Sequence, residues 1–190
     1  LRHWRRGSAP RRRHPGDRAR AGCGEHRGHP VPTLCRYQHA LDFDPILHAG
    51  YRQEQPLEPD LQRAQAEIQW AEHLVFVYPV WWGGVPALLK GFLDRVLLPG
   101  FGFRYRRSSS LWDRLLGGRS ARLIVTLDTP GWYFRWVWGA PAHRQMRQTV
   151  LEFCGVRPVR LTTFAPVRGS TPAQRQRWLQ DVSRLGSHGG

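Results

Sequence analysis

A short apolar run followed at once by a helical stripe constrains the fold of this chain more than any other feature. Residues 74–78, Leu-Val-Phe-Val-Tyr, are β-branched and aromatic and end at Pro79, which predicts a fully buried strand. Pro86 then suits the first turn of a helix. The apolar stripe of that helix runs through Leu88, Leu89, Phe92, Leu93, Val96 and Leu97. The turn between strand and helix is a candidate ligand platform, because backbone N–H groups and the positive end of the helix dipole converge there.

The rest of the chain from Leu41 onward alternates between helix and strand patterns. Residues 61–73 predict a helix with Asp60 as N-cap, and residues 121–126 predict a second buried strand with an exit turn at 127–131. Pro141 begins a helix that Gly155 ends, residues 156–166 read as a last strand, and Thr171 caps a carboxyl-terminal helix. This alternation predicts an α/β fold, a parallel sheet with helices on both faces.

Residues 1–40 have a different composition. They hold ten arginines against Asp17 and Glu25, a net charge of +8 out of +15 for the whole chain, and they show no helical or alternating period. Two interpretations stay open: an out-of-frame or misassigned amino terminus, or a disordered basic tail. Resequencing the locus separates them.

Composition limits the functional classes. Cys23, Cys35 and Cys154 have no metal-ligand spacing, which indicates free thiols in a reducing, cytoplasmic compartment and no metal site. No apolar run reaches the roughly 18 residues of a membrane span, so no membrane insertion is expected. The basic charge raises a nucleic-acid-binding protein as an alternative, but basic and aromatic residues do not interleave on a recognisable module, so we expect no nucleic-acid partner.

The segment YPVWWGGVPALLKGFLDRVLLPGFGF, residues 78–103, resembles the signature loop and helix of the flavodoxin-like NAD(P)H:quinone oxidoreductases. That family includes the modulator-of-drug-activity type and the ancillary subunits of potassium-efflux systems. The resemblance runs from about Leu41 to about Trp178. It implies a flavodoxin-like three-layer sandwich over residues 41–186, with the first strand and helix missing or distorted because residues 1–40 do not show them.

The resemblance also implies a flavin site at the carboxyl edge of the sheet. Pro79, Val80, Trp81, Trp82 and Gly83 are expected to line one side of the flavin ring, and Thr126, Leu127, Asp128 and Thr129 to make a second contact. Phe101, Gly102 and Phe103 are expected to close over the substrate ring from a partner subunit. Tyr133 and His143 are the candidate catalytic side chains, one hydrogen-bonding near the flavin and the other donating a proton to the reduced quinone.

Each of these assignments has a structural alternative. The two tryptophans could be core aromatics, Asp128 a turn or N-cap carboxylate, the two phenylalanines edge packing, and His143 a solvated side chain. Gly83 and Gly84 could form an ordinary flexible turn.

The functional expectation is an NAD(P)H-dependent flavoprotein, with FMN or FAD as cofactor, that reduces quinones by two-electron, ping-pong transfer as a homodimer. An alternative within the same resemblance is a flavin-binding regulatory subunit that docks to a potassium-efflux transporter. Quinone turnover in the absence of any partner distinguishes the two.

Overall fold

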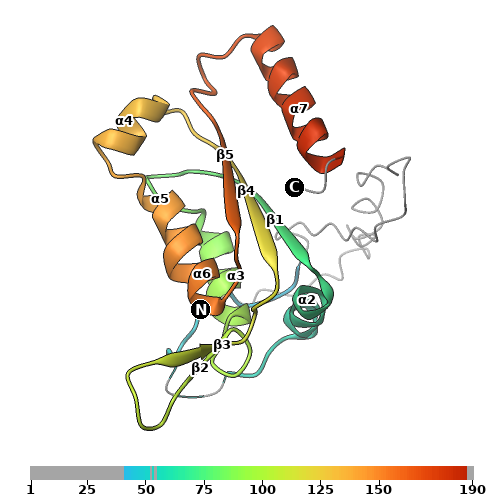
Figure 1. Cartoon of the computed structure of the whole chain (residues 1–190), viewed down its shortest axis with the longest axis vertical. Helices are drawn as coiled ribbons and strands as arrows, with labels where there is room; N and C mark the ends of the chain where they lie inside the picture. Colours follow the sequence, from blue (N-terminus) through green and yellow to red (C-terminus); the bar gives the residue numbers. More distant parts are fainter. Residues whose placement is uncertain (1–40, 52, 54, 188–190) are drawn as a thin grey trace, which may run out of the picture. The chain divides into compact units, whose positions relative to one another are not determined.

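The computed structural model describes residues 41–51, 53 and 55–187, and the predictions for residues 1–40 lie outside this part. Its centre is a parallel sheet of strand order β1-β4-β5 (Figure 1). The strands are β1 (His73–Pro79), β4 (Ser120–Thr126) and β5 (Val159–Phe164). Because all three run in the same direction, their carboxyl ends lie at one edge of the sheet. The predicted parallel sheet is therefore confirmed.

Helices flank the sheet, as the alternating pattern predicts. On one side lie α3 (Ala87–Val96) and a continuous helix made of α5 (Pro141–Arg144), a π-helical segment (Gln145–Leu151) and α6 (Glu152–Cys154) (Figure 1). Helix α7 (Pro172–Ser187) contacts the other face of the sheet, where the ring of Trp178 lies 5.3 Å from that of Phe164. The remaining elements are α2 (Pro59–Trp70), α4 (Gly131–Trp136) and the hairpin of β2 (Phe103–Tyr105) and β3 (Trp112–Arg114). None of the helices in the described residues has the length and apolar character needed to cross a membrane.

The core lies between the sheet and the helices on its first side. Of the predicted stripe, Leu89, Leu93 and Val96 of α3 and the following Leu97 are buried, whereas Leu88 is exposed. Leu123 and Val125 of β4 are buried against them, as expected for the second strand. Gly155 ends α6 with a φ of +104°, a conformation that favours glycine, so the predicted helix stop is also confirmed.

The prediction that residues 74–78 form a fully buried strand is wrong. Tyr78 is buried, but Val75 and Val77 are 55% and 71% exposed. Alternate residues of a strand face opposite sides of the sheet, and Val75 and Val77 lie on the face of β1 opposite to the buried Tyr78, where they stay exposed.

One further prediction is corrected. Helix α2 begins at Pro59 with Glu58 as N-cap, so Asp60 lies in the first turn, where it accepts a hydrogen bond from the Asp42 N–H. Proline at the first helical position moved this boundary. The β2–β3 hairpin lies within residues 101–116 and α4 largely within residues 132–138, two segments for which the sequence patterns predicted no helix or strand.

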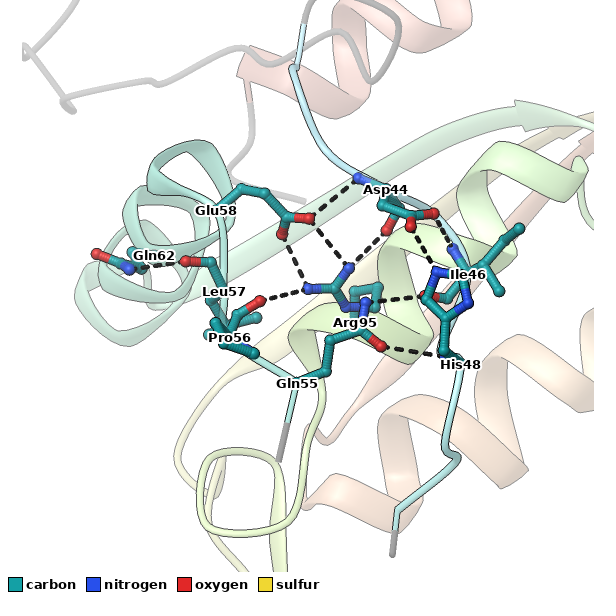
Figure 2. A network of polar contacts seen from close by, with 9 residues as sticks. All are labelled: Asp44, Ile46, His48, Gln55, Pro56, Leu57, Glu58, Gln62 and Arg95. Atoms are coloured by element: carbon teal, nitrogen blue, oxygen red, sulfur yellow. Dashed lines mark hydrogen bonds and ion pairs between the residues drawn. The ribbon is translucent and has the colours of Figure 1, made fainter. Parts of the chain in front are cut away.

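A buried arginine holds the segment 41–58 against α3 (Figure 2). Arg95 is fully buried and its guanidinium forms an ion pair with Glu58 at 2.9 Å. The same group donates to the carbonyl oxygens of Asp44 at 2.7 Å and Pro56 at 2.8 Å. One side chain thus satisfies acceptors on both ends of this segment.

Gly91, one turn before Arg95, allows the same segment to approach α3 closely. A Cβ at Gly91 would lie 2.5 Å from Pro45 Cβ and 2.6 Å from its carbonyl oxygen. In an open helix Gly→Ala adds about 1 kcal/mol of stability. Here we expect Gly91→Ala to lower the free energy of unfolding by roughly 1–3 kcal/mol, because the backbone at Pro45 must move. Urea denaturation measures the change.

Gly117→Ala is the matched control for this prediction, since nothing lies within 4 Å of the added Cβ. A Gly91→Ala protein as stable as the wild type would show that the segment 41–58 does not rest on α3 as described.

Candidate functional site

The chain leaves β1 in a tight turn that presents both tryptophans to solvent. Trp81 and Gly84 exchange two backbone hydrogen bonds of 3.0 and 2.9 Å around Trp82 and Gly83. Both central residues have positive φ, +51° at Trp82 and +75° at Gly83, as in a type I′ turn. Trp81 and Trp82 are exposed, so the alternative that they are core aromatics is wrong.

Trp82 is in a strained conformation. A bulky non-glycine residue at positive φ is uncommon, and such strain is found preferentially at ligand-binding positions. Gly83, by contrast, has the positive φ that glycine adopts without strain, as the sequence suggested. Within the described chain the N–H groups of Trp82 and Gly83 make no hydrogen bond, whereas those of Val80 and Trp81 bond to Thr126 and Gly84. The turn therefore offers two free donors beside two exposed indoles.

The loop after β4 lies directly beside this turn. The N–H of Val80 donates to the carbonyl oxygen of Thr126 at 2.8 Å, so the two strand ends are joined. Leu127 is buried and bonds to the end of β5. Asp128 accepts a hydrogen bond from the Arg168 N–H at 2.7 Å, which is the turn role offered as its alternative. The structure thus brings the two predicted flavin-contacting segments, 79–83 and 126–129, to one edge.

Helix α4 and the start of α5 form the third side of this edge. The turn at Gly83 faces them, since a Cβ there would lie 3.5 Å from Pro141 and 4.0 Å from Trp138. Tyr133 is partly exposed and its ring lies 5.8 Å from that of Trp138.

His143 is half-buried, with its ring 4.9 Å from that of Phe134 and its Nε2 3.5 Å from Thr163 Oγ1. Burial lowers the pKa of His143, so its imidazole is neutral at pH 7. The side chain is therefore not the freely solvated histidine of the alternative reading.

The predicted substrate residues lie at the other end of the sheet within one chain. The β2–β3 hairpin is found opposite α4 (Figure 1). Phe103 is buried, with ring contacts to Tyr51, Tyr105 and Phe153, and a Cβ at Gly102 would lie 3.0 Å from Cys154 Sγ. Phe103 thus packs in the chain's own interior, while Phe101 is half-buried. Their contribution to a partner's site stays a prediction.

The residues at the carboxyl edge fit a flat conjugated ring. The indoles supply an apolar wall, and the free N–H groups of the turn can donate to ring carbonyl oxygen atoms. Two shallow hollows on the described surface lie elsewhere, one lined by Arg147, Glu152 and Arg157 and one along α7. No three His, Cys, Asp or Glu side chains of the described residues gather where they could bind a metal ion.

A family model described as a flavodoxin-like fold matches residues 28–185 of the chain. The chain belongs to this family. The match begins ahead of Leu41, where the sequence resemblance was placed. The resemblance to flavodoxin-like quinone oxidoreductases is confirmed at the level of the family.

Two curated relatives indicate the branch of the flavodoxin-like family. The chain is 32% identical over 102 residues to an uncharacterized NAD(P)H oxidoreductase of Haemophilus influenzae, a match that covers 52% of this chain and 50% of the relative. It is 31% identical over 133 residues to the human ribosyldihydronicotinamide dehydrogenase [quinone], covering 63% and 52%. The chain thus spans about half the length of each relative.

A solved structure supports the same fold. The protein Smu.1420 from Streptococcus mutans UA159 superposes with a TM-score of 0.63 and 28% identity, covering 75% of this chain and 76% of that one. In this flavodoxin-like chain, sequence reasoning missed two features of the candidate site, the strained backbone of Trp82 and the exposed tryptophans of α4. The crowding of aromatic residues at 132–138 was the available signal for the second.

Proposed function

We propose that this flavodoxin-like protein is a flavin-dependent NAD(P)H oxidoreductase that reduces quinones or similar planar acceptors. The observation that carries the proposal is the turn at the end of β1, where exposed indoles and free N–H groups of Trp82 and Gly83 lie beside the loop after β4. The names of the two curated relatives support the choice of NAD(P)H and quinone as substrates.

In this proposal the residues of the chain bind and orient the flavin ring and exclude water from it. The bound flavin, FMN or FAD, supplies two-electron transfer between nicotinamide and quinone, which occupy the same place in turn. Trp81 and Trp82 would hold the ring plane, and the N–H groups of Trp82 and Gly83, which make no hydrogen bond within the described chain, would donate to its polar edge, with the loop 126–129 as the second contact. His143 lies at the same edge and is the proposed proton donor to the acceptor oxygen; the donating form is the imidazolium, which becomes neutral imidazole on transfer and which burial makes the minor form at pH 7.

A second copy of the chain completes the site in this proposal. The β2–β3 hairpin, which follows Phe101 and Gly102 and begins at Phe103, lies at the opposite end of the sheet from α4 in the same chain (Figure 1). A homodimer in which this region of one copy covers the candidate site of the other would exclude water from the reacting ring. The expected location of such an enzyme is the cytoplasm.

Flavin binding and turnover test the proposal directly. We expect the purified full chain, titrated with FMN or FAD, to show the absorption bands of bound oxidised flavin and to oxidise NADH or NADPH only when a soluble benzoquinone is present. No binding of either flavin would refute the assignment.

Gly83→Val tests whether the turn is the flavin seat. A β-branched residue at a φ of +75° is strained by about 1–3 kcal/mol, and relief of this strain distorts the turn. We expect flavin affinity, measured by fluorescence quenching, to fall by about tenfold or more. Gly118→Val is the matched control: its φ is +82° and nothing lies within 4 Å of its Cβ, but it precedes the amino end of β4. Equal losses in both variants would count against the seat.

A further inference from the structure

Helix α4 presents an apolar face that no described element covers. Trp132, Trp136 and Val137 are 65%, 76% and 56% exposed. These three residues, together with Arg135, are called the α4 surface below. They lie outside the turn and loops assigned to the flavin, so the proposed cofactor does not account for them.

The α4 surface is held outward by the packing of the same helix. Phe134 is 1% exposed and points into the core, with ring contacts to Trp138 and His143. Trp132 and Trp136 are four residues apart and therefore share one helical side. The N–H of Ala140 also bonds to the carbonyl oxygen of Phe134, which fixes the end of the helix. The tryptophans are thus displayed on a short, anchored helix.

The charged residues of the segment that carries the α4 surface are all basic. Residues 129–151 contain Arg135, Arg144 and Arg147 and no aspartate or glutamate, and Arg147 is paired with Glu152 at 2.9 Å. The guanidinium of Arg135 lies 5.2 Å from the ring centre of Trp136, so apolar area and positive charge are adjacent. Asp128, the nearest acidic residue before this segment, pairs with Arg168. Such a combination of exposed tryptophans and arginines complements a partner surface that has an anionic outer layer over an apolar interior.

We propose that the α4 surface, which adjoins the candidate site, docks peripherally on an anionic phospholipid membrane, and that the acceptor is a lipophilic quinone dissolved in it. Tryptophan side chains favour the headgroup region because the indole is apolar with one polar N–H. Arginines beside them gain from the negative surface potential of anionic lipid. This docking needs no spanning segment, and it deepens the proposed function by naming its substrate class.

Charge favours a membrane over a second copy of the chain at this position. Across a two-fold axis the α4 surface would meet itself, and the Arg135 side chains of two copies would approach without an acidic residue of segment 129–151 between them. Like charges placed together in this way are unfavourable. Dimerisation through the α4 surface is therefore an outcome of the test, not the proposal.

Vesicle binding by the full chain tests the docking without any flavin. The protein is sedimented with vesicles of phosphatidylcholine alone or with an equal part of phosphatidylglycerol, and the comparison is made with Trp132→Ser/Trp136→Ser. We expect about tenfold tighter binding to the anionic vesicles, and a loss of about tenfold in the double variant. Trp70→Ser is the matched control, because Trp70 is 57% exposed on α2 and should leave binding unchanged. The arginine-rich residues 1–40 are present in all of these proteins, so the difference reports on α4.

A charge variant tests the contribution of the arginines to vesicle binding. Arg135→Glu/Arg144→Glu should abolish the preference for anionic vesicles while the tryptophans remain. The proposal is overturned if the double tryptophan variant binds like the wild type, or if it only converts a dimer to a monomer in sedimentation velocity. Docking and the proposed function can fail separately: vesicle binding without turnover of a soluble quinone refutes the enzyme, and turnover without vesicle binding refutes the docking.

Discussion

Replacing Arg95 by leucine is expected to lower the free energy of unfolding by about 3–5 kcal/mol, because the change leaves a carboxylate and two carbonyl groups without their partner. Arg95 is fully buried and bonds to Glu58 and to the carbonyl oxygens of Asp44 and Pro56 (Figure 2). Chemical denaturation followed by circular dichroism measures the loss. The effect should be among the largest of any single substitution, since the Arg95 side chain is fully buried.

Lys90→Met is the control for Arg95→Leu on the same helix. Lys90 pairs with Asp94 at 2.6 Å, but both side chains are partly exposed, so we expect a change of less than about 1 kcal/mol. Similar losses in the two variants would mean that burial of the Arg95 pair contributes nothing.

The Arg95 pair also gives the stability of the protein a defined pH dependence. Burial acts to raise the pKa of Glu58, but hydrogen bonds from the Glu58 and Asp44 N–H groups and from Arg95 outweigh it and lower the pKa. Because the pKa of Glu58 is lower in the folded state, its carboxylate contributes to the free energy of unfolding. This contribution is fully present above the ordinary pKa of 4.5 and is lost as the pH falls through the lowered pKa. The stability difference between wild type and Arg95→Leu should therefore shrink in acid. A difference that stays constant down to pH 3 would argue against the ion pair.

Phe134→Ala is expected to cost about 3–5 kcal/mol of stability, because a fully buried ring is removed from beneath α4. The same change removes the ring that lies 4.9 Å from His143. Since burial lowers the pKa of His143, we expect this pKa to rise toward its ordinary value of 6.5 in the variant. Thermal denaturation measures the first effect, and NMR titration of the imidazole measures the second.

Trp132→Ala, on the exposed side of the same helix, is the control for Phe134→Ala. It should change stability by no more than about 0.5 kcal/mol and leave the His143 titration unaltered. If Phe134→Ala destabilises the protein but His143 titrates as before, then the two rings are not packed as described.

Much of this fold follows from local patterns in the sequence. The strands of the described sheet are each a short apolar or β-branched run, and the stripe of α3 matches the buried residues Leu89, Leu93 and Val96. The cap at Thr171 is equally local, since its hydroxyl accepts from the Gln174 N–H at 3.2 Å. Signals of this kind involve residues a few positions apart, so they can be recognised without the tertiary structure.

The features that sequence reasoning missed depend on distant residues. Arg95 is 37 positions from Glu58 and 51 from Asp44, so its burial cannot be recognised from the helix alone. The exposure of Val75 and Val77 depends on which elements cover β1, and an apolar run does not specify its neighbours. Helix α4 has six residues, too short to show a helical period.

The same limit applies to the candidate site. The order of motifs placed segments 79–83 and 126–129 at one edge, but the φ of Trp82 and the burial of Phe103 are properties of the folded chain.

The left-handed backbone at Trp82 has a consequence for how substitutions there should be understood. For the turn alone, glycine would be the better residue, because it adopts this conformation without steric penalty. An indole held there, pointing into solvent, adds nothing to the interior of the molecule. Its contribution has to come from whatever rests against the ring, so tolerance of other flat side chains at this position, and intolerance of small ones, would be the mark of a stacking surface.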